Sequence, residues 1–250
     1  MMNKIRLDQY LIQNNYCQTR SQAQQLIKLG NVKVDNNVIL KNNFLVDETN
    51  NISTSQLKYV SRAGFKLEHA LIEFSIKLKN KVVLDIGAST GGFTDCCLQF
   101  GAKKVYALDV GTNQLDSKLL LDSRVQSFEQ TNLKSINKSL FDEKIDLIVC
   151  DVSFISLKHV FYVLQDFYNS NIDLIFLIKP QFELDKKTMS KNKGFVKNEK
   201  DRKLAISNVV QYAKNNNLKL IKLIESPIVG NKKNNIEYLG YFKWQEPSLC

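Results

Sequence analysis

A glycine-rich turn between two apolar segments constrains the fold of this chain more than any other feature of its sequence. The β-branched, apolar run 81–86 leads into the turn 87–92, which contains three glycines. Residues 93–100 follow with a helical pattern, and a second apolar run, 104–108, leads into Asp109. Strand, glycine turn, helix, strand and acid form one half of a doubly wound nucleotide-binding fold.

The spacing of the glycines indicates which nucleotide the turn binds. A dinucleotide fingerprint needs G-x-G-x-x-G, whereas this chain has Gly87-x-x-x-Gly91-Gly92. The wider turn, with Asp85 two residues before it, resembles the first motif of methyltransferases that use S-adenosylmethionine (SAM). Asp109 is then placed to accept hydrogen bonds from both ribose hydroxyls. A phosphate-binding or merely structural glycine turn is the alternative.

The charge of the whole chain favours a polyanionic partner, and a simple compositional bias toward Lys and Asn is the alternative. Its 250 residues carry 35 Lys and Arg against 25 Asp and Glu, a formal net charge of +10. Such an excess favours nucleic acid or an anionic membrane surface as partner. No run approaches the roughly 18 apolar residues of a membrane span, and residues 1–10 lack the pattern of a secretory signal. We therefore expect a cytoplasmic protein without a membrane partner.

The cysteine pattern predicts no metal site. Five cysteines are present, and none of them forms a C-x-x-C pair. An odd set of this kind argues against a zinc site or a disulfide framework. Reduced thiols packed as small apolar side chains are the simpler expectation.

The first 45 residues or so have the pattern of two helices followed by a hairpin. Residues 6–14 and 19–29 both have helical periodicity, and the second helix starts with the capping box Thr19-x-x-Gln22. Residues 32–40 alternate between apolar and polar side chains, which predicts two strands around a turn at 36–37.

Residues 4–50 resemble the S4 RNA-binding domain in their Arg-Ser … Gly-x-Val-x-Val pattern. The resemblance implies that basic side chains of this segment face RNA phosphates, and an ordinary solvated basic face is the alternative. With the polar stretch that follows, we predict an S4-like domain over 1–52, a linker over 53–60 and a catalytic domain over 61–250. The residues expected to bind RNA are Arg6, Arg20, Lys28, Lys33 and Arg62.

Beyond residue 58 the chain alternates between helical and strand patterns. A helix opens the catalytic domain, and a second one is predicted over 157–168. The segment 184–203 holds eight Lys and Arg against three acids, and we interpret it as a mobile basic loop that enters a helix. After Asp109, further strands are predicted over 124–128, 145–151, 173–179, 219–224 and 236–243, the last two antiparallel at one sheet edge.

Charged residues end two otherwise apolar strands, at Asp151 and Lys179. In open α/β sheets, ligands bind beyond the carboxyl ends of the strands, so both side chains are expected beside the ligand. Lys66 and Glu237 complete a group of two lysines and two carboxylates. A structural ion pair between neighbouring strands is the alternative interpretation.

Five motifs follow one another along the chain: Ser61-Arg-Ala-Gly-Phe-Lys66, the turn Gly-Ala-Ser-Thr-Gly-Gly-Phe-Thr from Gly87, Asp151-Val-Ser-Phe-Ile-Ser-Leu, Lys179-Pro-Gln-Phe-Glu, and Gly230 … Asn235-Ile-Glu237-Tyr. With these motifs the chain resembles the TlyA family over nearly its whole length. Members of that family are SAM-dependent ribosomal RNA cytidine-2′-O-methyltransferases, and some are also called haemolysins. One departure is Ser61-Arg-Ala, where most members have Ser-Arg-Gly.

The resemblance implies an α/β, Rossmann-like SAM-dependent methyltransferase fold with a mostly parallel seven-stranded sheet, joined to a small N-terminal α+β S4 RNA-binding domain. Its catalytic half is similar to the FtsJ-type 2′-O-methyltransferases, whose Lys-Asp-Lys-Glu tetrad corresponds to Lys66, Asp151, Lys179 and Glu237. The residues expected to contact SAM are Asp85, Gly87, Ala88, Ser89, Gly91, Gly92, Phe93, Asp109, Val110, Thr131, Asn132 and Asp151.

The substrate implied by the resemblance is ribosomal RNA or a ribosomal subunit. We expect 23S rather than 16S rRNA, because the chain stops 13 residues after Glu237 and is shorter than the longer members. A monomer is expected in solution. A non-catalytic RNA-binding or ribosome-assembly protein and a haemolysin-like activity are the alternatives.

The chemistry of the tetrad leaves two roles open for Lys179. A ribose 2′-hydroxyl is a poor acid, so it must lose its proton as it attacks the methyl group. Lys179 serves as the base if desolvation or neighbouring positive charge makes it neutral. Alternatively, both lysines stay charged and stabilise the developing alkoxide electrostatically.

Overall fold

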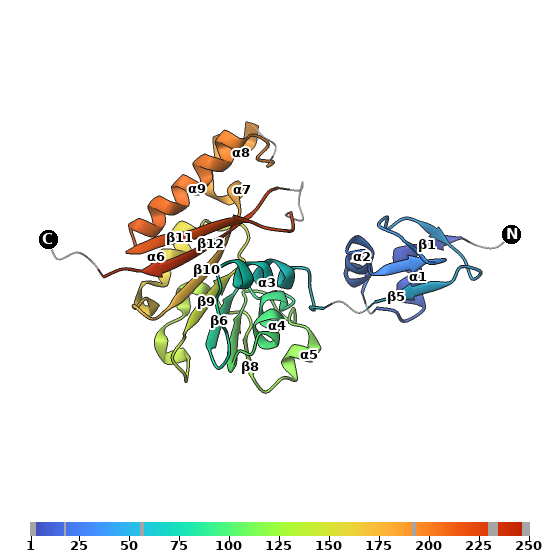
Figure 1. Ribbon diagram of the computed structural model, residues 1–250, viewed down its shortest axis with the longest axis horizontal. Coiled ribbons are helices and arrows are strands. Elements are labelled where there is room, and N and C mark those ends of the chain that lie inside the picture. The colour runs from blue at the N-terminus through green and yellow to red at the C-terminus, as the bar shows by residue number, and fades with distance from the viewer. Residues whose placement is uncertain (1–3, 18, 56–57, 192–193, 230–234, 247–250) are drawn as a thin grey trace. The chain divides into compact units, whose positions relative to one another are not determined.

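The structure of the protein is a computed structural model that divides the chain into two compact units, with the boundary between Arg62 and Ala63 (Figure 1). Each unit has a hydrophobic core of its own. The residues that the structure describes are 4–17, 19–55, 58–191, 194–229 and 235–246.

Two short helices form much of the core of the first unit. α1 (Leu7–Gln13) packs against α2 (Arg20–Lys28), and apolar side chains of both helices meet the buried residues of the small strands. The predicted capping box is present, because the Thr19 side chain accepts a hydrogen bond from the Gln22 backbone and the Gln22 side chain returns one. The two helices predicted from periodicity are therefore confirmed.

Two small sheets complete the first unit. β2 (Val32–Val34) is the central strand of a three-stranded sheet, between β3 (Asn37–Val38) and β5 (Ile52–Thr54). β1 (Ile5–Arg6) pairs with β4 (Leu45–Val46) in a sheet of two strands. All the pairings are antiparallel, so the unit has the α+β architecture expected for it.

The structure corrects two details of the first unit. The hairpin turn lies at Asp35 and Asn36, whose φ angles are 49° and 68°, one position earlier than the predicted 36–37. Residues 53 and 54 of the predicted linker belong to β5, a strand of polar composition that is fixed by pairing with β2. Residues 56 and 57 of the predicted linker lie outside the described residues.

A seven-stranded sheet forms the centre of the second unit (Figure 1). In sheet order its strands are β11 (Leu218–Glu225), β12 (Tyr238–Trp244), β10 (Asp173–Ile178), β9 (Leu147–Cys150), β6 (Val82–Ile86), β7 (Lys104–Leu108) and β8 (Val125–Phe128). The five strands from β10 to β8 are parallel, and β12 is antiparallel to both of its neighbours. The mostly parallel sheet of seven strands, with its antiparallel pair at one edge, is confirmed.

Helices cover the sheet in two groups (Figure 1). The helices are α3 (Ala63–Glu73), α4 (Gly92–Gln99), α5 (Ser117–Leu120), α6 (Leu157–Val163), α7 (Pro180–Glu183), α8 (Lys186–Lys191) and α9 (Glu199–Lys214), with the 3-10 turns η1 (Leu133–Ser135), η2 (Lys138–Leu140) and η3 (Gln165–Phe167). α3 packs with α4, and α6 packs with α9. The core between α6, α9 and the sheet is built from side chains such as Leu84, Ile148 and Phe176, all fully buried.

Two predicted segments of the second unit differ from the structure. The segment predicted as a basic loop contains α8, because Asp185 accepts hydrogen bonds from the backbone and the hydroxyl of Thr188, both at 2.8 Å, and so begins a short helix without apolar periodicity. The helix predicted over 157–168 ends at Val163, and the 3-10 turn η3 follows. In the described parts of the chain, no helix has the length and apolarity needed to cross a bilayer.

The order of the strands defines where a ligand binds. The chain enters the sheet at β6, adds β7 and β8 on one side, and then returns to add β9 and β10 on the other. Ligands of open α/β sheets lie at this switch point, beyond the carboxyl ends of the strands. The end of β6 and the end of β9 are neighbours there, since Ile86 pairs with Cys150.

Candidate active site

The glycine turn after β6 lies directly against the end of β9. A Cβ atom on Gly87 would stand 2.9 Å from the backbone oxygen of Asp151, and the φ of Gly87 is +80°. Only glycine meets both conditions without strain. The turn predicted to bind SAM and the first carboxylate of the predicted tetrad are therefore brought together by the fold.

Asp85 is fully buried beneath this turn. Its Oδ2 accepts a hydrogen bond from the Thr94 hydroxyl at 2.7 Å, while its Oδ1 has no hydrogen-bond partner among the described residues. Burial raises the pKa of this carboxyl from 3.8 to about 7, and the Thr94 hydrogen bond opposes the rise. A buried carboxylate with an unsatisfied oxygen has capacity for one more donor.

Asp109 ties together the two loops beside the turn. Its Oδ2 accepts from the backbone N–H of Ser89 at 2.8 Å, and its Oδ1 accepts from that of Gly111 at 2.7 Å. A carboxylate has about four lone-pair sites, so both oxygens keep capacity for hydroxyl donors. Asp109 thus remains a candidate for binding a ribose, in a position fixed by two backbone donors.

The other residues predicted to bind SAM are distributed unevenly around these loops. Val110 is 69% exposed next to Asp109, and the backbone N–H of Thr131 donates to the Asp109 carbonyl oxygen. Asn132 caps η1 through the Lys134 backbone, which occupies part of its side chain. Phe93 is only 2% exposed, so the structure places it in the core rather than on the surface of the turn. Ala88, Gly91 and Gly92 are also buried, whereas Ser89 is exposed.

The donor and acceptor set of this region fits SAM. The orphaned oxygen of Asp85 suits an ammonium group, the Asp109 carboxylate suits two ribose hydroxyls, and exposed Val110 offers an apolar contact. Gly91, with φ +91°, has no room for a side chain, since its Cβ would lie 2.2 Å from Leu119. In the described residues, no group of His, Cys, Asp and Glu is arranged to hold a metal ion.

The four residues of the predicted tetrad meet in one chain of alternating charge. Lys66 Nζ donates to Glu237 Oε2 at 2.6 Å and lies 3.8 Å from Asp151 Oδ2. Lys179 Nζ lies 2.6 Å from Asp151 Oδ1, an ion pair whose angles fall outside those of a hydrogen bond. Lys66, Lys179 and Glu237 are at most 7% exposed. The fold therefore assembles a buried Glu–Lys–Asp–Lys row from positions up to 171 residues apart.

Each tetrad residue is positioned by a different element. Lys66 comes from α3, Asp151 follows β9, and Lys179 follows β10. Glu237 precedes β12, and because β12 is antiparallel, its start lies at the carboxyl edge of the parallel strands, with Tyr238 opposite Ile178.

Two further side chains of interest stand on the β9–α6 loop, residues 151–156, which begins with Asp151. Ser153 Oγ accepts a hydrogen bond from Lys179 Nζ at 2.8 Å. Phe154 is 76% exposed, has a φ of +67°, and its ring lies 5.3 Å from that of Phe182. An aromatic residue in the left-handed region is an outlier of the kind that clusters at functional sites.

In the first unit, two of the predicted RNA-binding arginines share a buried partner. Asp8 accepts two hydrogen bonds from Arg6, at 2.9 and 3.0 Å, and single ones from Arg20 and Gln24. The Arg6 contact holds the pKa of Asp8 well below its usual range. Lys28 and Lys33 are exposed, and Arg62 is half-buried.

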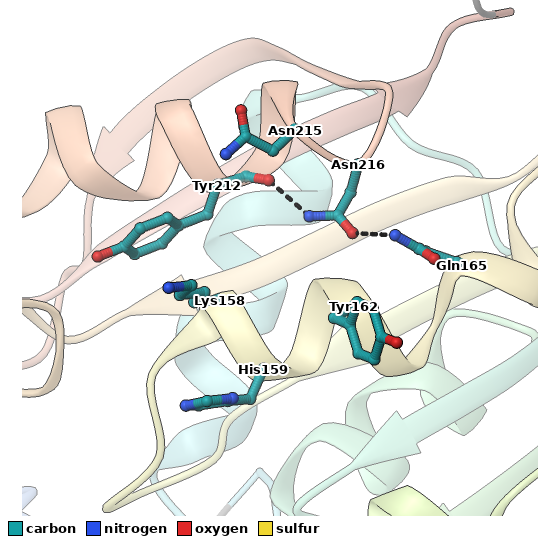
Figure 2. Close-up of a pocket in the computed structure, with 7 residues that line it drawn as sticks. All are labelled: Lys158, His159, Tyr162, Gln165, Tyr212, Asn215 and Asn216. Carbon is teal, nitrogen blue, oxygen red and sulfur yellow. Dashed lines mark hydrogen bonds between the residues drawn. The ribbon is translucent and has the colours of Figure 1, made fainter.

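A separate cavity lies between α6 and α9 (Figure 2). Its volume is about 370 Å³. One wall carries Gln165, whose amide donates to Asn216 Oδ1 at 2.6 Å, and Asn216 in turn donates to the Tyr212 carbonyl oxygen. None of its lining residues belongs to the tetrad or to the predicted SAM set, so it is not part of the site described above.

Comparison with known proteins decides the family. Residues 59–243 match the FtsJ-like methyltransferase family, and residues 5–52 match the S4 domain. The 16S/23S rRNA (cytidine-2′-O)-methyltransferase TlyA of Mycobacterium tuberculosis is 34% identical over 248 residues, covering 98% of this chain and 92% of that protein. This chain belongs to the TlyA family.

Other members support the same assignment. Hemolysin A of Brachyspira hyodysenteriae is 45% identical over 240 residues, which cover 95% of this chain and 99% of that protein. The structure of a putative hemolysin from Streptococcus thermophilus is 35% identical, with a TM-score of 0.76 and coverage of 98% of this chain and 90% of that one. The TlyA family joins an S4 domain to an FtsJ-like, SAM-dependent methyltransferase, so the family and the fold predicted from the sequence are confirmed.

Sequence reasoning missed several residues in and around the candidate site. They are Thr94, Ser153, Phe154 and Glu183, each with a contact on an element that carries or adjoins a predicted site residue. All four stand inside motifs that carry the family resemblance, yet their partners are 9 to 28 positions away in sequence. Their position in a motif was the sequence signal that could have identified these residues. Their contacts become visible only in the folded structure. Gly230, at the start of the last motif, lies outside the described residues.

Proposed function

We propose that this protein transfers the methyl group of SAM to the ribose 2′-oxygen of a cytidine in ribosomal RNA. The observation that carries the proposal is the contact between the glycine turn and the tetrad. The Gly87 backbone passes so close to Asp151 that a Cβ atom there would lie 2.9 Å from the Asp151 carbonyl oxygen. Asp151 also supplies the carboxylate that lies between Lys66 and Lys179. A methyl donor held by the turn is thereby next to the charged row.

The tetrad provides what 2′-O-methylation demands of the protein. SAM supplies an electrophilic methyl group, and the ribose hydroxyl must be held in line with it while losing its proton. Positioning of this kind lowers the activation barrier by up to roughly 7–11 kcal/mol in the best intramolecular cases. Each lysine has a carboxylate at 2.6 Å, which supports the alternative in which Lys179 keeps its proton and stabilises the alkoxide.

The surroundings of the tetrad suit a nucleotide. Phe154 presents an exposed aromatic ring on the loop that carries Asp151, and unstacked RNA bases bind to such rings.

In the first unit, the exposed side chains of Arg20, Lys28 and Lys33 suit phosphates, although Arg6 is largely committed to Asp8. Arg62 is proposed as a further RNA contact.

The substrate is proposed to be 23S rRNA, free or in a ribosomal subunit, and the protein to act as a cytoplasmic monomer. The name of the M. tuberculosis relative includes both 16S and 23S rRNA, so the two RNAs must be tested side by side. The domain limits 1–52 and 61–250, with residues 53–60 as linker, are part of the same proposal, with β5 extending the first domain to Thr54.

The experiment is transfer of tritiated methyl groups from SAM to 16S and 23S rRNA, each free and in its subunit. Methylation of a 2′-oxygen removes the nucleophile of alkaline cleavage, so the labelled linkage should resist alkaline hydrolysis. Lys179→Ala should lower the rate at least about 100-fold, with little change in RNA affinity. The matched control is Lys144→Ala, an exposed lysine before β9 at the opposite edge of the sheet. Near-normal transfer by Lys179→Ala, or label only on bases, would contradict the proposal.

A further inference from the structure

A buried carboxylate, Glu183, joins the β9–α6 loop to the helix that follows Lys179. It is 5% exposed and lies at the end of α7, which begins immediately after Lys179. Its Oε2 accepts a hydrogen bond from the Ser156 hydroxyl at 2.6 Å, and its Oε1 accepts one from the Leu157 backbone at 2.9 Å. Both oxygens of Glu183 thus bind the end of the β9–α6 loop.

The other end of the same loop holds the Lys179 side chain. Ser153 Oγ accepts from Lys179 Nζ at 2.8 Å, and the Asp151 carboxylate lies 2.6 Å from that nitrogen. The contacts therefore form a closed ring of interactions. The Lys179 side chain binds the loop, the loop binds Glu183, and α7 connects Glu183 covalently to Lys179. The covalent parts of this ring are the loop between Ser153 and Ser156 and the helix α7, which is four residues long.

The loop needs an external support to keep this shape. Phe154, in its middle, has a φ of +67°, and a non-glycine residue in that region costs about 1–3 kcal/mol, so it persists only where surrounding structure holds it. The ring of Phe182 contacts Phe154 from α7, and Asn208 donates to the Glu183 carbonyl at 2.9 Å, which fixes α7 to α9. Glu183 supplies the two hydrogen bonds that hold the loop to this platform.

We propose that Glu183 is a positioning residue for methyl transfer: it fixes the β9–α6 loop so that Ser153 and Asp151 hold the Lys179 ammonium in its working place. This inference rests on the proposed function of Lys179. Glu183 acts through the loop, since its described partners are Ser156 and Leu157 rather than members of the tetrad.

The test is a double-mutant cycle of Glu183→Gln and Ser153→Ala, read by the single-turnover rate of methyl transfer. Rates are expressed per SAM-binding site titrated by calorimetry, so that unfolded protein does not count. Glu183→Gln should lower the rate about 10-fold or more, because a displacement of the order of 1 Å costs up to about 100-fold. Its SAM affinity and RNA affinity should stay within about twofold of those of the wild type. Glu199→Gln, at an exposed acid of α9 paired with Lys203, is the matched control and should leave the rate unchanged.

The cycle separates positioning from general stability. If Glu183 acts through Ser153, the two substitutions disrupt the same contact and their effects are not additive. The rate of the double variant should then lie within about twofold of the rate of the slower single variant. Fold-losses that multiply would overturn the inference, and so would a Glu183→Gln rate per SAM site equal to that of the wild type. Ser156→Ala, which removes one of the two hydrogen bonds to Glu183, should give a smaller loss in the same direction. An unchanged rate in that variant would also count against the inference.

The result is distinguishable from failure of the proposed function. If Lys179→Ala loses transfer while Glu183→Gln retains it, only the positioning role is wrong. If Lys179→Ala retains transfer, the tetrad mechanism itself is wrong, whatever Glu183 does.

Discussion

At the scale of single residues, burial has its clearest energetic consequence at Asp85. It is the only fully buried carboxylate of the described SAM region, and one of its oxygens has no hydrogen-bond partner there. Because burial disfavours the charged form, the folded protein keeps the proton of Asp85 up to about pH 7. The unfolded chain loses it near pH 3.8.

This difference links protonation of Asp85 to the stability of the catalytic unit. Between pH 4 and 7 the folded state binds more protons than the unfolded state, so stability falls as pH rises through this range and levels off above about pH 7. The slope attributable to Asp85 should approach about 1.4 kcal/mol per pH unit. Asp85→Asn should abolish this component of the slope.

The measurement is urea unfolding at pH 4 to 8, followed by the fluorescence of Trp244, the single tryptophan of the chain, on β12. The difference in unfolding free energy between wild type and Asp85→Asn isolates the residue from other carboxylates. Asp166→Asn, at an exposed aspartate, serves as the control. A difference that stays constant from pH 4 to 8 would show that Asp85 is ionised throughout.

At the scale of elements, Asp8 joins α1 to α2. It stands on α1, is fully buried, and accepts hydrogen bonds from Arg20 and Gln24 of α2 as well as from Arg6. Its pKa is held below the usual range, first by the Arg6 hydrogen bond. The stability that this provides is therefore present above about pH 4 and is lost as the pH falls further.

Asp8→Asn should loosen the first unit without affecting the second. Loss of the hydrogen bonds to a charged group should cost about 2 kcal/mol. That figure corresponds to roughly thirtyfold faster hydrogen exchange of the α1 and α2 amides, since 1.36 kcal/mol is a factor of ten. Exchange measured by mass spectrometry, with the Trp244 unfolding transition as internal control, checks both halves of the prediction. Unchanged exchange in α1 and α2 would mean that apolar packing alone holds these helices.

Most elements of this protein could be predicted because their signals are local. The runs Val82–Ile86 and Lys104–Leu108 are mainly apolar, with Asp85 and Lys104 as their charged residues, as expected of parallel strands buried on both faces. The capping box of α2 is written in two residues three positions apart. Element boundaries and types of this kind depend on neighbours in sequence, and here they agree with the fold.

The parts that could not be predicted depend on distant partners. β5 has a polar sequence, and only its pairing with β2 makes it a strand. In the same way, the four tetrad residues could be named from motifs, and Glu183 stands in one of those motifs. The sequence does not show, however, that the partners of Glu183 come from a different loop. Strand patterns indicate which residues reach the carboxyl edge of the sheet, but they do not show which side chains form hydrogen bonds there.

At the scale of the whole molecule, two units divide the proposed labour. The residues predicted for the SAM site and the tetrad all lie beyond the boundary between Arg62 and Ala63, whereas the exposed side chains of Arg20, Lys28 and Lys33 belong to the first unit. Phosphate contacts position a protein on RNA without reading its sequence. Selection of one ribose in a large RNA therefore calls for recognition of folded RNA shape by a remote contact.

A chain that begins at Ser55 should fold and bind SAM with nearly unchanged affinity, because β5 ends at Thr54 and the core of the second unit is its own. It should lose methylation of rRNA. Calorimetry with SAM and tritium transfer to rRNA test the two halves of this prediction. Full activity at the same nucleotide in the shortened chain would make the first unit dispensable.

In the full chain, neutralising Arg20, Lys28 and Lys33 together should reduce the log–log salt slope of RNA binding by about 2, at roughly 0.7 per phosphate contact.

The strand order also dictates when the parts of this protein can form. In the described sheet, β11 is joined to the rest only through β12, which follows it in the chain. During synthesis β11 therefore emerges before the strand with which it pairs, and its insertion must wait for β12. The ion pair between Lys66 and Glu237 forms after a still longer delay, because Glu237 is synthesised 171 residues after Lys66. The row of charges at the carboxyl edge is thus among the last features of the nascent chain to form, well after the cofactor turn beside it.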